Sequence, residues 1–402
     1  MSLVAAGCTG GSENAAAGGE CQTPGFSADQ VKLGIVYPDS GTLGPILGPA
    51  RSGMAARIQE ANDAGGIHGR RIVYEWRDDA GDRGRNLQAV RDLVENENVF
   101  GLLEASTAAS GGADYLAQNQ VPVAGLPAES AWTKYANMFA YSYLFTEGSS
   151  VDTFGQYVVA QGGRKAAFLN SDLQQAITTD IGHKIEASLA AAGVEIVPEK
   201  FVYNQTVPDV RRLATRIKDS GADVVVATLS AASVAEVMEG LRAVQANIKV
   251  VLSPNGYDRS LLGQVGPKLA GLSVFLNYVP FEANTEAHRR YLDSMARYAP
   301  ELVAADQEIA FVAYIATDLF LHGLEVAGPC PTRQDFIQSL RAVTDYNADG
   351  LLPGPVNLTE SFGQISTCYT FIKINAAGDG FEIVPSPNAP DGQGTQWCGR
   401  RI

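Results

Sequence analysis

The chain has 402 residues, of which 46% are hydrophobic, and a formal net charge of −14 at pH 7. This length allows a large buried core and, at a typical domain size of roughly 100–200 residues, predicts two lobes. The net negative charge argues against binding to nucleic acid or to anionic lipid through a basic surface. No uninterrupted apolar run reaches the ~18 residues of a membrane-spanning helix, so we expect no such helix.

The first 30 residues have the character of an export-signal remnant followed by a disordered tether. Small residues directly precede Cys8, which resembles the lipobox of bacterial lipoproteins, although Ala5 stands where that pattern prefers leucine. The tract after Cys8 is rich in glycine, serine and alanine and too polar to fold. A chance Ala-Gly-Cys in a disordered tail is the alternative. We predict lipidation of Cys8 and an extracytoplasmic protein, either anchored at the outer face of the cytoplasmic membrane or periplasmic.

Apolar, β-rich runs alternate with helical stretches in the next part of the chain. Strands are predicted at residues 31–38, 71–76, 99–103 and 121–125, and helices at residues 50–64 and 86–97. Met54, Ile58 and Ala61 form one apolar stripe along the first of these helices. The alternation is typical of a parallel sheet that is covered by helices on both faces.

The same pattern then starts again and predicts a second doubly wound lobe. Its strands are expected at residues 165–170, 195–203, 223–229, 249–253 and 272–278, and its helices at 179–192, 207–220 and 233–246. Two later helices, at residues 286–298 and 308–327, need a place to bury their apolar stripes, and we assign them to the first lobe. Strands at residues 366–375 and 380–384 are expected to join the second lobe.

One motif links this pattern to a known family. Residues 60–72 read Glu-Ala-Asn-Asp-Ala-Gly-Gly-Ile-His-Gly-Arg-Arg-Ile, and Asp78 and Asp79 follow. Gly65 and Gly66 are suited to end a helix with left-handed backbone. The stretch resembles the signature of leucine/isoleucine/valine-type periplasmic binding proteins, which are substrate-binding subunits of ABC transporters. The similar order of elements extends from about residue 31 to about residue 383.

The resemblance implies an α/β fold in which two doubly wound parallel-sheet lobes are joined by three hinge crossovers, with ligand between the lobes. We place the crossovers near residues 143–146, 277–281 and 352–357. Lobe 1 is then expected to comprise residues 31–144 and 280–352, and lobe 2 residues 145–279 and 353–402. Ligand contacts that exist only in the closed form would swing the lobes shut.

The loops that follow the strands of lobe 1 supply the first candidate site residues. Helix N-termini at the carboxyl ends of parallel strands offer free N–H groups to an acceptor-rich ligand. In the family, the loops after the third and fourth strands hold a ligand carboxylate through hydroxyls and amides. The candidates are Thr42, Glu104, Ala105, Ser106, Thr107, Ala128 and Ser130. The alternative for Ser106 and Ser130 is that they only cap helices.

The corresponding loops of lobe 2 depart from the amino-acid binders. The candidates are Asp172, Gln175, Ser230, Asn255 and Tyr257, with Tyr278 and Phe281 as further walls. Asn255 stands where the amino-acid binders carry the glutamate that pairs with the ligand ammonium, and a buried ammonium without such a partner is costly. Glu104, Asp172 or Asp258 could replace that charge or remain solvated loop acids. We predict a small, amino-acid-like ligand that bears a carboxylate or an amide and can include an aromatic ring.

The remaining cysteines indicate disulfides. Cys21, Cys330, Cys368 and Cys398 are an even set, which suits two bridges in an oxidising compartment. Three pairings are open, and we favour Cys330–Cys368 with Cys21–Cys398. The four histidines lie far apart and no CxxC is present, so we expect no metal site and no cofactor.

Other classes of protein have less support. The chain contains no nucleophile elbow, zinc-protease motif or Walker loop, and we predict that it is not an enzyme. A sensory or regulatory receptor domain of the same fold is the alternative function. By the resemblance, the expected partners are a small-molecule ligand and the membrane permease of an ABC transporter. We expect a monomer that touches the membrane only through its lipid anchor.

Overall fold

A five-stranded parallel sheet forms the centre of lobe 1. The computed structural model describes residues 21–172, 176–387 and 394–402. Within this part, the first sheet has the strand order β2-β1-β3-β4-β5, and all its pairs are parallel. Its strands are β1 (Gln30–Tyr37), β2 (Arg71–Asp78), β3 (Leu102–Glu104), β4 (Val123–Gly125) and β5 (Met138–Phe139). The order reverses direction between β1 and β3, as in a doubly wound sheet.

A larger mixed sheet forms the centre of lobe 2. Its order is β12-β11-β10-β9-β8-β6-β7, with β13 paired to β11. The pairs from β7 to β10 are parallel, whereas β11 is antiparallel to β10, β12 and β13. Its strands are β6 (Lys165–Ser171), β7 (Glu195–Tyr203), β8 (Val224–Ala227), β9 (Val250–Ser253), β10 (Leu272–Leu276), β11 (Cys368–Ile374), β12 (Phe381–Ile383) and β13 (Gln396–Cys398).

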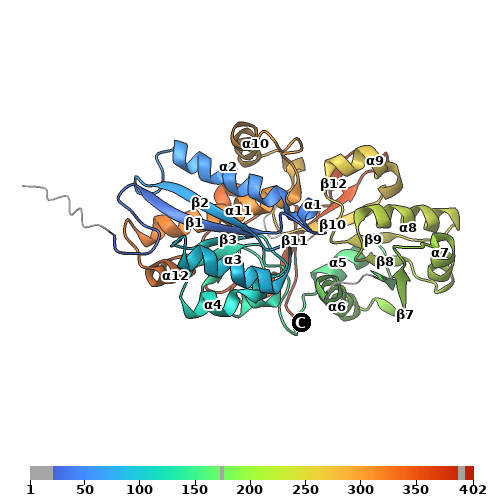
Figure 1. The fold of residues 1–402 in the computed structure, drawn as a ribbon. Coiled ribbons are helices and arrows are strands. Elements are labelled where there is room, and N and C mark those ends of the chain that lie inside the picture. Colours follow the sequence, from blue (N-terminus) through green and yellow to red (C-terminus); the bar gives the residue numbers. More distant parts are fainter. Residues whose placement is uncertain (1–20, 173–175, 388–393) are drawn as a thin grey trace, which may run out of the picture.

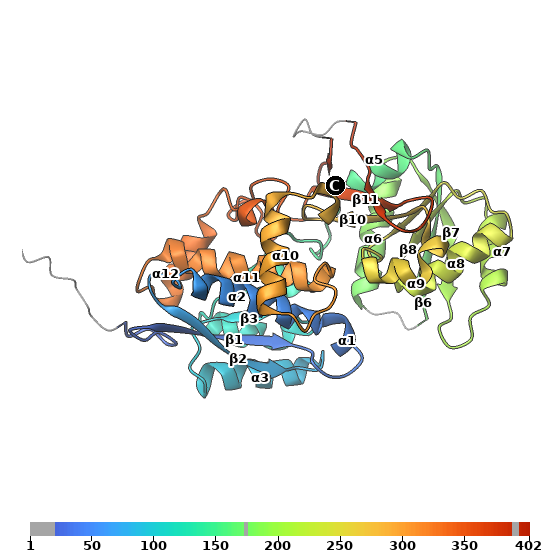
Figure 2. The same cartoon turned by 90° about the horizontal axis from the view of Figure 1, so that it is seen from above.

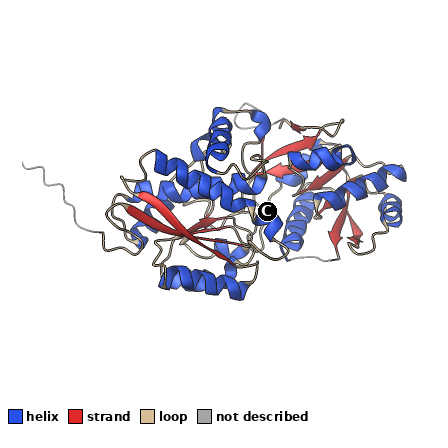
Figure 3. Cartoon of the chain, turned by 45° about the horizontal axis from the view of Figure 1, so that its top comes forward, coloured by secondary structure: helices blue, strands red, loops and turns tan. Residues whose placement is uncertain are grey.

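Helices cover both sheets, and the two lobes lie side by side (Figure 3). The helices of the first lobe are α1 (Gly44–Leu47), α2 (Pro49–Asp63), α3 (Arg83–Glu95), α4 (Ala113–Gln118), α10 (Glu286–Tyr298), α11 (Glu308–Ala327) and α12 (Arg333–Arg341). Those of the second are α5 (Thr153–Ala160), α6 (Ala176–Ala191), α7 (Val210–Asp219), α8 (Ala231–Ala243) and α9 (Arg259–Leu269). Figure 1 shows α2 and α3 on opposite faces of the first sheet. The predicted α/β fold class is therefore confirmed.

Helix α11 corrects one expectation from the sequence. By length and composition alone it is apolar enough to cross a membrane, with a mean hydropathy of 1.5, because scattered polar residues do not interrupt its apolar character. In this structure 72% of the most apolar 18-residue stretch of the helix is buried. The helix packs on α2 so closely that a Cβ on Gly53 would lie 2.0 Å from the Ala310 carbonyl oxygen. Its apolar surface is thus used in the core of lobe 1.

The family motif folds as its glycines require. Gly65 and Gly66 have φ angles of 104° and 75° after the end of α2, in the left-handed region that favours glycine. A Cβ on Gly66 would lie 2.0 Å from the Arg70 carbonyl oxygen, so the turn leaves no room for a side chain there. The motif therefore encodes a tight connection from α2 to β2.

The long predicted elements are present with small shifts at their ends, but several short ones were missed. The 20-residue helix α11 and the strand β7 have the predicted bounds. Sequence periodicity did not predict the short elements α1, α4, α5, β5 and β13, nor the helices α9 and α12. Too few residues repeat in the short elements to show a pattern, and Pro267 lies inside α9.

The favoured disulfide pairing is wrong. The structure joins Cys21 to Cys330 and Cys368 to Cys398. Cys368 and Cys398 face each other in the antiparallel pair of β11 and β13, with a Cα–Cα distance of 4.1 Å. The Thr23 hydroxyl donates to the Pro331 carbonyl oxygen, which places the segment of Cys21 beside Cys330. Each bridge therefore depends on strand or loop pairing that sequence spacing does not reveal.

Candidate functional site

The sheet order defines where ligands bind in such folds, namely beyond the carboxyl ends of strands at the point where the winding reverses. In this protein those points lie between β1 and β3 and between β6 and β8. Helix α1, which follows β1, lies on the side of lobe 1 that faces lobe 2 (Figure 2). Arg259, at the start of α9 in lobe 2, forms ion pairs with Asp306 at 3.2 Å and Glu282 at 2.6 Å. The strand-end loops are thus close to the junction of the lobes.

The loop after β1 is held in place by Asp78. One carboxylate oxygen of Asp78 accepts hydrogen bonds from the amides of Asp39 and Ser40, and the other accepts from the Ser40 hydroxyl. Thr42, a predicted ligand contact, follows on this loop and is exposed. The Thr42 hydroxyl has no protein partner within the described part of the chain, so it remains accessible to a ligand.

Behind the loop after β3 lies a buried polar network that the sequence did not predict. The Asn86 side-chain amide donates to Asp79 at 3.0 Å and to Glu104 at 2.6 Å, and the Ser106 hydroxyl donates to Asp79. Burial, with a smaller contribution from the charge of Asp79, raises the pKa of Glu104 to about 8. Glu104 is therefore mostly protonated at neutral pH and is not suited to balance a ligand ammonium.

Ser106 has a structural role in this network. Its side chain is 1% exposed, and its hydroxyl donates to Asp79 and accepts from the Ala108 amide. Those contacts occupy the hydroxyl that we expected to bind ligand. Thr107, the next residue, is only partly buried, and neither its amide nor that of Ser106 has a hydrogen-bond partner in the described residues. The amides and the Thr107 side chain are therefore the groups of this loop that can bind a carboxylate.

The other predicted residues of lobe 1 differ in accessibility. Ala105 is buried, and its amide donates to the Val36 carbonyl oxygen. The Ala128 amide donates to the Leu126 carbonyl oxygen, so it is used within its own turn. Ser130 is partly buried and its hydroxyl lies beside the Glu147 carboxylate. Of these three, only Ser130 has a side chain that can form hydrogen bonds, and its hydroxyl contacts Glu147.

Lobe 2 presents polar groups that are largely exposed. Asn255 donates from its side-chain amide to the Leu229 carbonyl oxygen at 3.0 Å, which places it next to Ser230. The Ser230 hydroxyl accepts from the Ser233 amide and caps α8. The Asp172 carboxylate accepts from the Gln205 amide, and Asp258 caps α9. Gln175 lies outside the described residues.

The predicted aromatic walls are buried at the hinge rather than exposed between the lobes. Tyr257, Tyr278 and Phe281 are 4%, 1% and 9% exposed. The Tyr257 hydroxyl donates to Glu282, and that of Tyr278 donates to Glu308 at 2.9 Å. Burial raises the pKa of Glu308 to about 7. In this structure the three rings therefore join lobe 1 to the end of β10.

The three crossover segments lie side by side. The Tyr141 hydroxyl contacts the Asn277 side chain at 3.4 Å, and the Ser142 and Ser366 hydroxyls are 2.8 Å apart. Buried Lys184 on α6 donates to the carbonyl oxygens of Thr146 and Ser149, which fixes the first crossover to lobe 2. Leu358 still pairs with lobe 1 through the Val343 carbonyl oxygen, several residues beyond the predicted lobe limit at residue 352.

Sequence reasoning missed Asp79, Asn86, Glu308 and Lys184 as site or hinge residues. Asp79 had a usable signal, since it directly follows β2 and is one of the two aspartates that accompany the family motif. Asn86 and Lys184 lie within helices, where a polar residue on an inward face carries no distinctive pattern. The described residues contain no group of three or more acidic, histidine or cysteine side chains that could hold a metal ion.

Comparison with known proteins decides the family. Residues 30–379 match the sequence profile of a family described as "Periplasmic binding protein". The chain belongs to this family. The periplasmic binding proteins bind solutes and are not enzymes. A Leu/Ile/Val-binding protein homologue from Brucella melitensis is 30% identical over 222 residues, which cover 50% of this chain and 52% of that relative. The match thus spans about half the length of such relatives.

Solved structures show the same fold at low sequence identity. A fatty acid ABC transporter substrate-binding protein from Thermomonospora curvata has a TM-score of 0.70 and 19% identity, covering 90% of this binding protein and 93% of that chain. A branched-chain amino acid binding protein from Streptococcus pneumoniae in complex with isoleucine has a TM-score of 0.68, 15% identity, and coverages of 89% and 99%. A benzoate-bound protein from R. palustris has a TM-score of 0.67, 15% identity, and coverages of 88% and 95%.

Proposed function

We propose that this periplasmic binding protein is the solute-binding subunit of an ABC importer and captures a small carboxylate-bearing or amide-bearing ligand between its lobes. Membership of the family carries this proposal. The free amides of Ser106 and Thr107 on one lobe, and the exposed side chains of Ser230 and Asn255 on the other, supply donors that suit a carboxylate.

The ligand class follows from the charges at the strand ends. Asn255 carries no charge, and Glu104 is buried, with a pKa of about 8. Neither group can balance a buried ammonium, which is costly without a carboxylate partner. A carboxylate that lacks an ammonium, aromatic or aliphatic, therefore suits these loops better than an α-amino acid does. Structures of the same fold include complexes with isoleucine and with benzoate and a fatty acid ABC transporter substrate-binding protein, so the fold is compatible with each of these ligand classes.

Transport function also requires partners at the membrane. We propose that the closed form is recognised by a permease and that Cys8, which lies outside the described residues, carries a lipid anchor. Mass spectrometry of the protein produced with its native leader tests the anchor. A mature N-terminus at any residue other than an acylated Cys8 would contradict it.

A calorimetric titration tests the ligand class. We expect benzoate or a short fatty acid to bind the full chain stoichiometrically and isoleucine to bind more weakly. Binding of branched-chain amino acids alone would overturn the proposed class. Thr107→Val keeps the side-chain shape and removes the hydroxyl, so it should weaken binding about tenfold, a loss of roughly 1.4 kcal/mol. Thr215→Val on the exposed face of α7 is the matched control and should leave affinity unchanged.

A further inference from the structure

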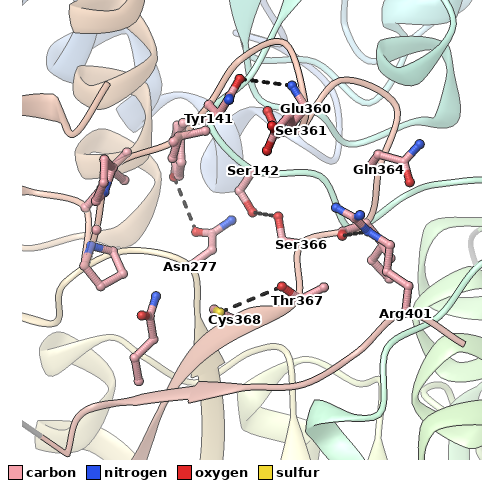
Figure 4. Close-up of a pocket in the computed structure, with 18 residues that line it drawn as sticks. Tyr141, Ser142, Asn277, Glu360, Ser361, Gln364, Ser366, Thr367, Cys368 and Arg401 are labelled. Atoms are coloured by element: carbon pink, nitrogen blue, oxygen red, sulfur yellow. Dashed lines mark hydrogen bonds between the residues drawn. The ribbon is translucent and has the colours of Figure 1, made fainter. Parts of the chain in front are cut away.

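A pocket lies at the hinge. It has a volume of about 460 Å3 and is lined by residues from all three crossovers, including Ser142, Asn277 and Ser366 (Figure 4). None of the strand-end loop residues of the candidate site belongs to its lining. The pocket is therefore separate from the place where we propose that the transported solute binds.

The walls of the hinge pocket come from both lobes. Val356 is paired with Tyr346 of lobe 1 by an isolated bridge, whereas Arg401 is paired with Val151 of lobe 2. Gln396 lies on β13 of the second sheet. Because these walls belong to two bodies, their separation changes whenever the lobes rotate about the crossovers. A molecule that bridges them would favour one hinge angle over others.

The lining has polar groups that lack protein partners. The Ser361 hydroxyl is buried and has no hydrogen-bond partner. Asn277 uses only its carbonyl oxygen, which accepts from Tyr141. Arg401 donates from Nε to the Ile365 carbonyl oxygen, and neither Arg401 nor Glu360 forms an ion pair within the described part of the chain. Figure 4 shows Glu360 and Arg401 on different sides of the pocket.

From this arrangement we propose that the hinge pocket is a second small-molecule site, which binds a zwitterion and thereby biases closure of the lobes. The carboxylate of the zwitterion pairs with the free guanidinium nitrogens of Arg401, and its cationic group faces Glu360. Asn277 and Ser361 supply further hydrogen bonds. The balanced charges of the lining disfavour a ligand with a net charge. By linkage, such a ligand and the transported solute alter each other's affinity by the same factor.

Binding to the hinge pocket is tested with the full chain and no solute present, so the result does not depend on the proposed function. The probes are glycine betaine, proline and β-alanine, and myo-inositol is an uncharged control. Their binding is measured by ligand-detected NMR and by calorimetry. We expect at least one zwitterion to bind saturably and each of Arg401→Gln and Glu360→Gln to weaken it about tenfold. Absence of binding by all three probes, or binding that both variants retain, overturns the proposal.

Gly354 provides a second test, in which a side chain fills the pocket. A Cβ at this pocket residue meets no heavy atom within 4 Å, so Gly354→Trp can fill the hinge pocket without disturbing the core. We expect this variant to abolish zwitterion binding, to keep the unfolding midpoint, and to shift the inter-lobe distance measured by spin labels. Gly263→Trp on α9, where the Cβ also meets open space, is the matched control. Zwitterion affinity equal to wild type in Gly354→Trp would contradict the proposal.

Discussion

The strand-end loops of the two lobes use their polar groups in different ways. In lobe 1, Asp79, Asn86, Glu104 and Ser106 are buried and bonded to one another. In lobe 2, Asp172, Ser230 and Asn255 are exposed, and their side chains bond to backbone groups of the same lobe. Lobe 1 therefore holds its binding loop in a fixed shape before ligand arrives, and the described loops of lobe 2 leave their side chains accessible to solvent.

The contrast between the two sets of loops shows that similar residues at equivalent positions can have different roles. Ser106 and Ser230 both follow a strand, yet one is a positioning residue inside a lobe and the other caps a helix at the surface. Rigid loops lower the entropic cost of binding, and exposed loops can complete the site on closure. Four predictions test the contrast, from the largest expected effect to the smallest.

The largest effect is expected from Asp79→Ala. The change leaves the buried Ser106 hydroxyl without its acceptor and removes one of the two hydrogen bonds that the Asn86 side-chain amide donates. We expect the free energy of unfolding to fall by about 3 kcal/mol. Denaturant unfolding measures the loss. Asp172→Ala, in the exposed loop of lobe 2, is the control and should change stability by no more than about 0.5 kcal/mol. Equal losses in the two variants would remove the proposed difference between the lobes.

The pH dependence of stability tests the buried carboxyl of lobe 1. The pKa of Glu104 rises from 4.5 to about 8 on folding, so the native state binds its proton more tightly than the unfolded state does. Its stabilisation is complete below about pH 4.5 and is lost as the pH rises through about 8. Glu104→Gln should flatten this part of the profile. Glu308→Gln should remove a smaller part of the pH dependence of stability, the part that ends near pH 7. A profile that Glu104→Gln does not alter would contradict the burial of an ionisable group.

Lys184 tests whether the buried polar contacts of lobe 2 are concentrated at the hinge. Lys184→Met leaves the carbonyl oxygens of Thr146 and Ser149 without this donor and should cost about 2 kcal/mol. Lys200→Met removes a more exposed ion pair with Glu186 and should cost less than about 1 kcal/mol. Both are measured by thermal unfolding. If Lys184→Met is as mild as its control, the first crossover is held by other contacts.

Ser230 gives the smallest effect. Loss of its cap in Ser230→Ala should lower stability by about 1 kcal/mol, and Ser230→Asn should restore most of it because asparagine also caps helices. Calorimetric binding of the identified ligand to both variants separates the two roles. If stability and affinity recover together in Ser230→Asn, the hydroxyl serves only as a cap and does not contact ligand.

Much of the fold was predictable because it depends on local pattern. The apolar stripe of α2 and the β-rich runs of β1 and β7 are properties of a few neighbouring residues. The glycines of residues 65–69 encode a turn by their own conformational freedom. Short elements such as α4 and β5 were missed because packing against neighbours, and not periodicity, stabilises them.

The candidate site was predictable only as a set of loops. Thr42, Ser230 and Asn255 follow strands and are exposed, but Ser106 and the three aromatic residues turn inward. A hydroxyl after a strand has the same sequence pattern whether it faces a ligand or a buried aspartate. Its partner, Asp79, belongs to another strand end and is brought there by the parallel pairing of the first sheet.

The sequence alone determined the two α/β lobes, the family and the approximate loops of the site, since these follow from hydrophobic periodicity and from one contiguous motif. Only the tertiary structure decided the pairing of Cys21 with Cys330, the burial of Glu104 and Glu308, and the assembly of a pocket from three crossovers. Each of these joins residues from distant parts of the chain. Their proximity is set by how sheets and helices pack, which no local pattern of residues records.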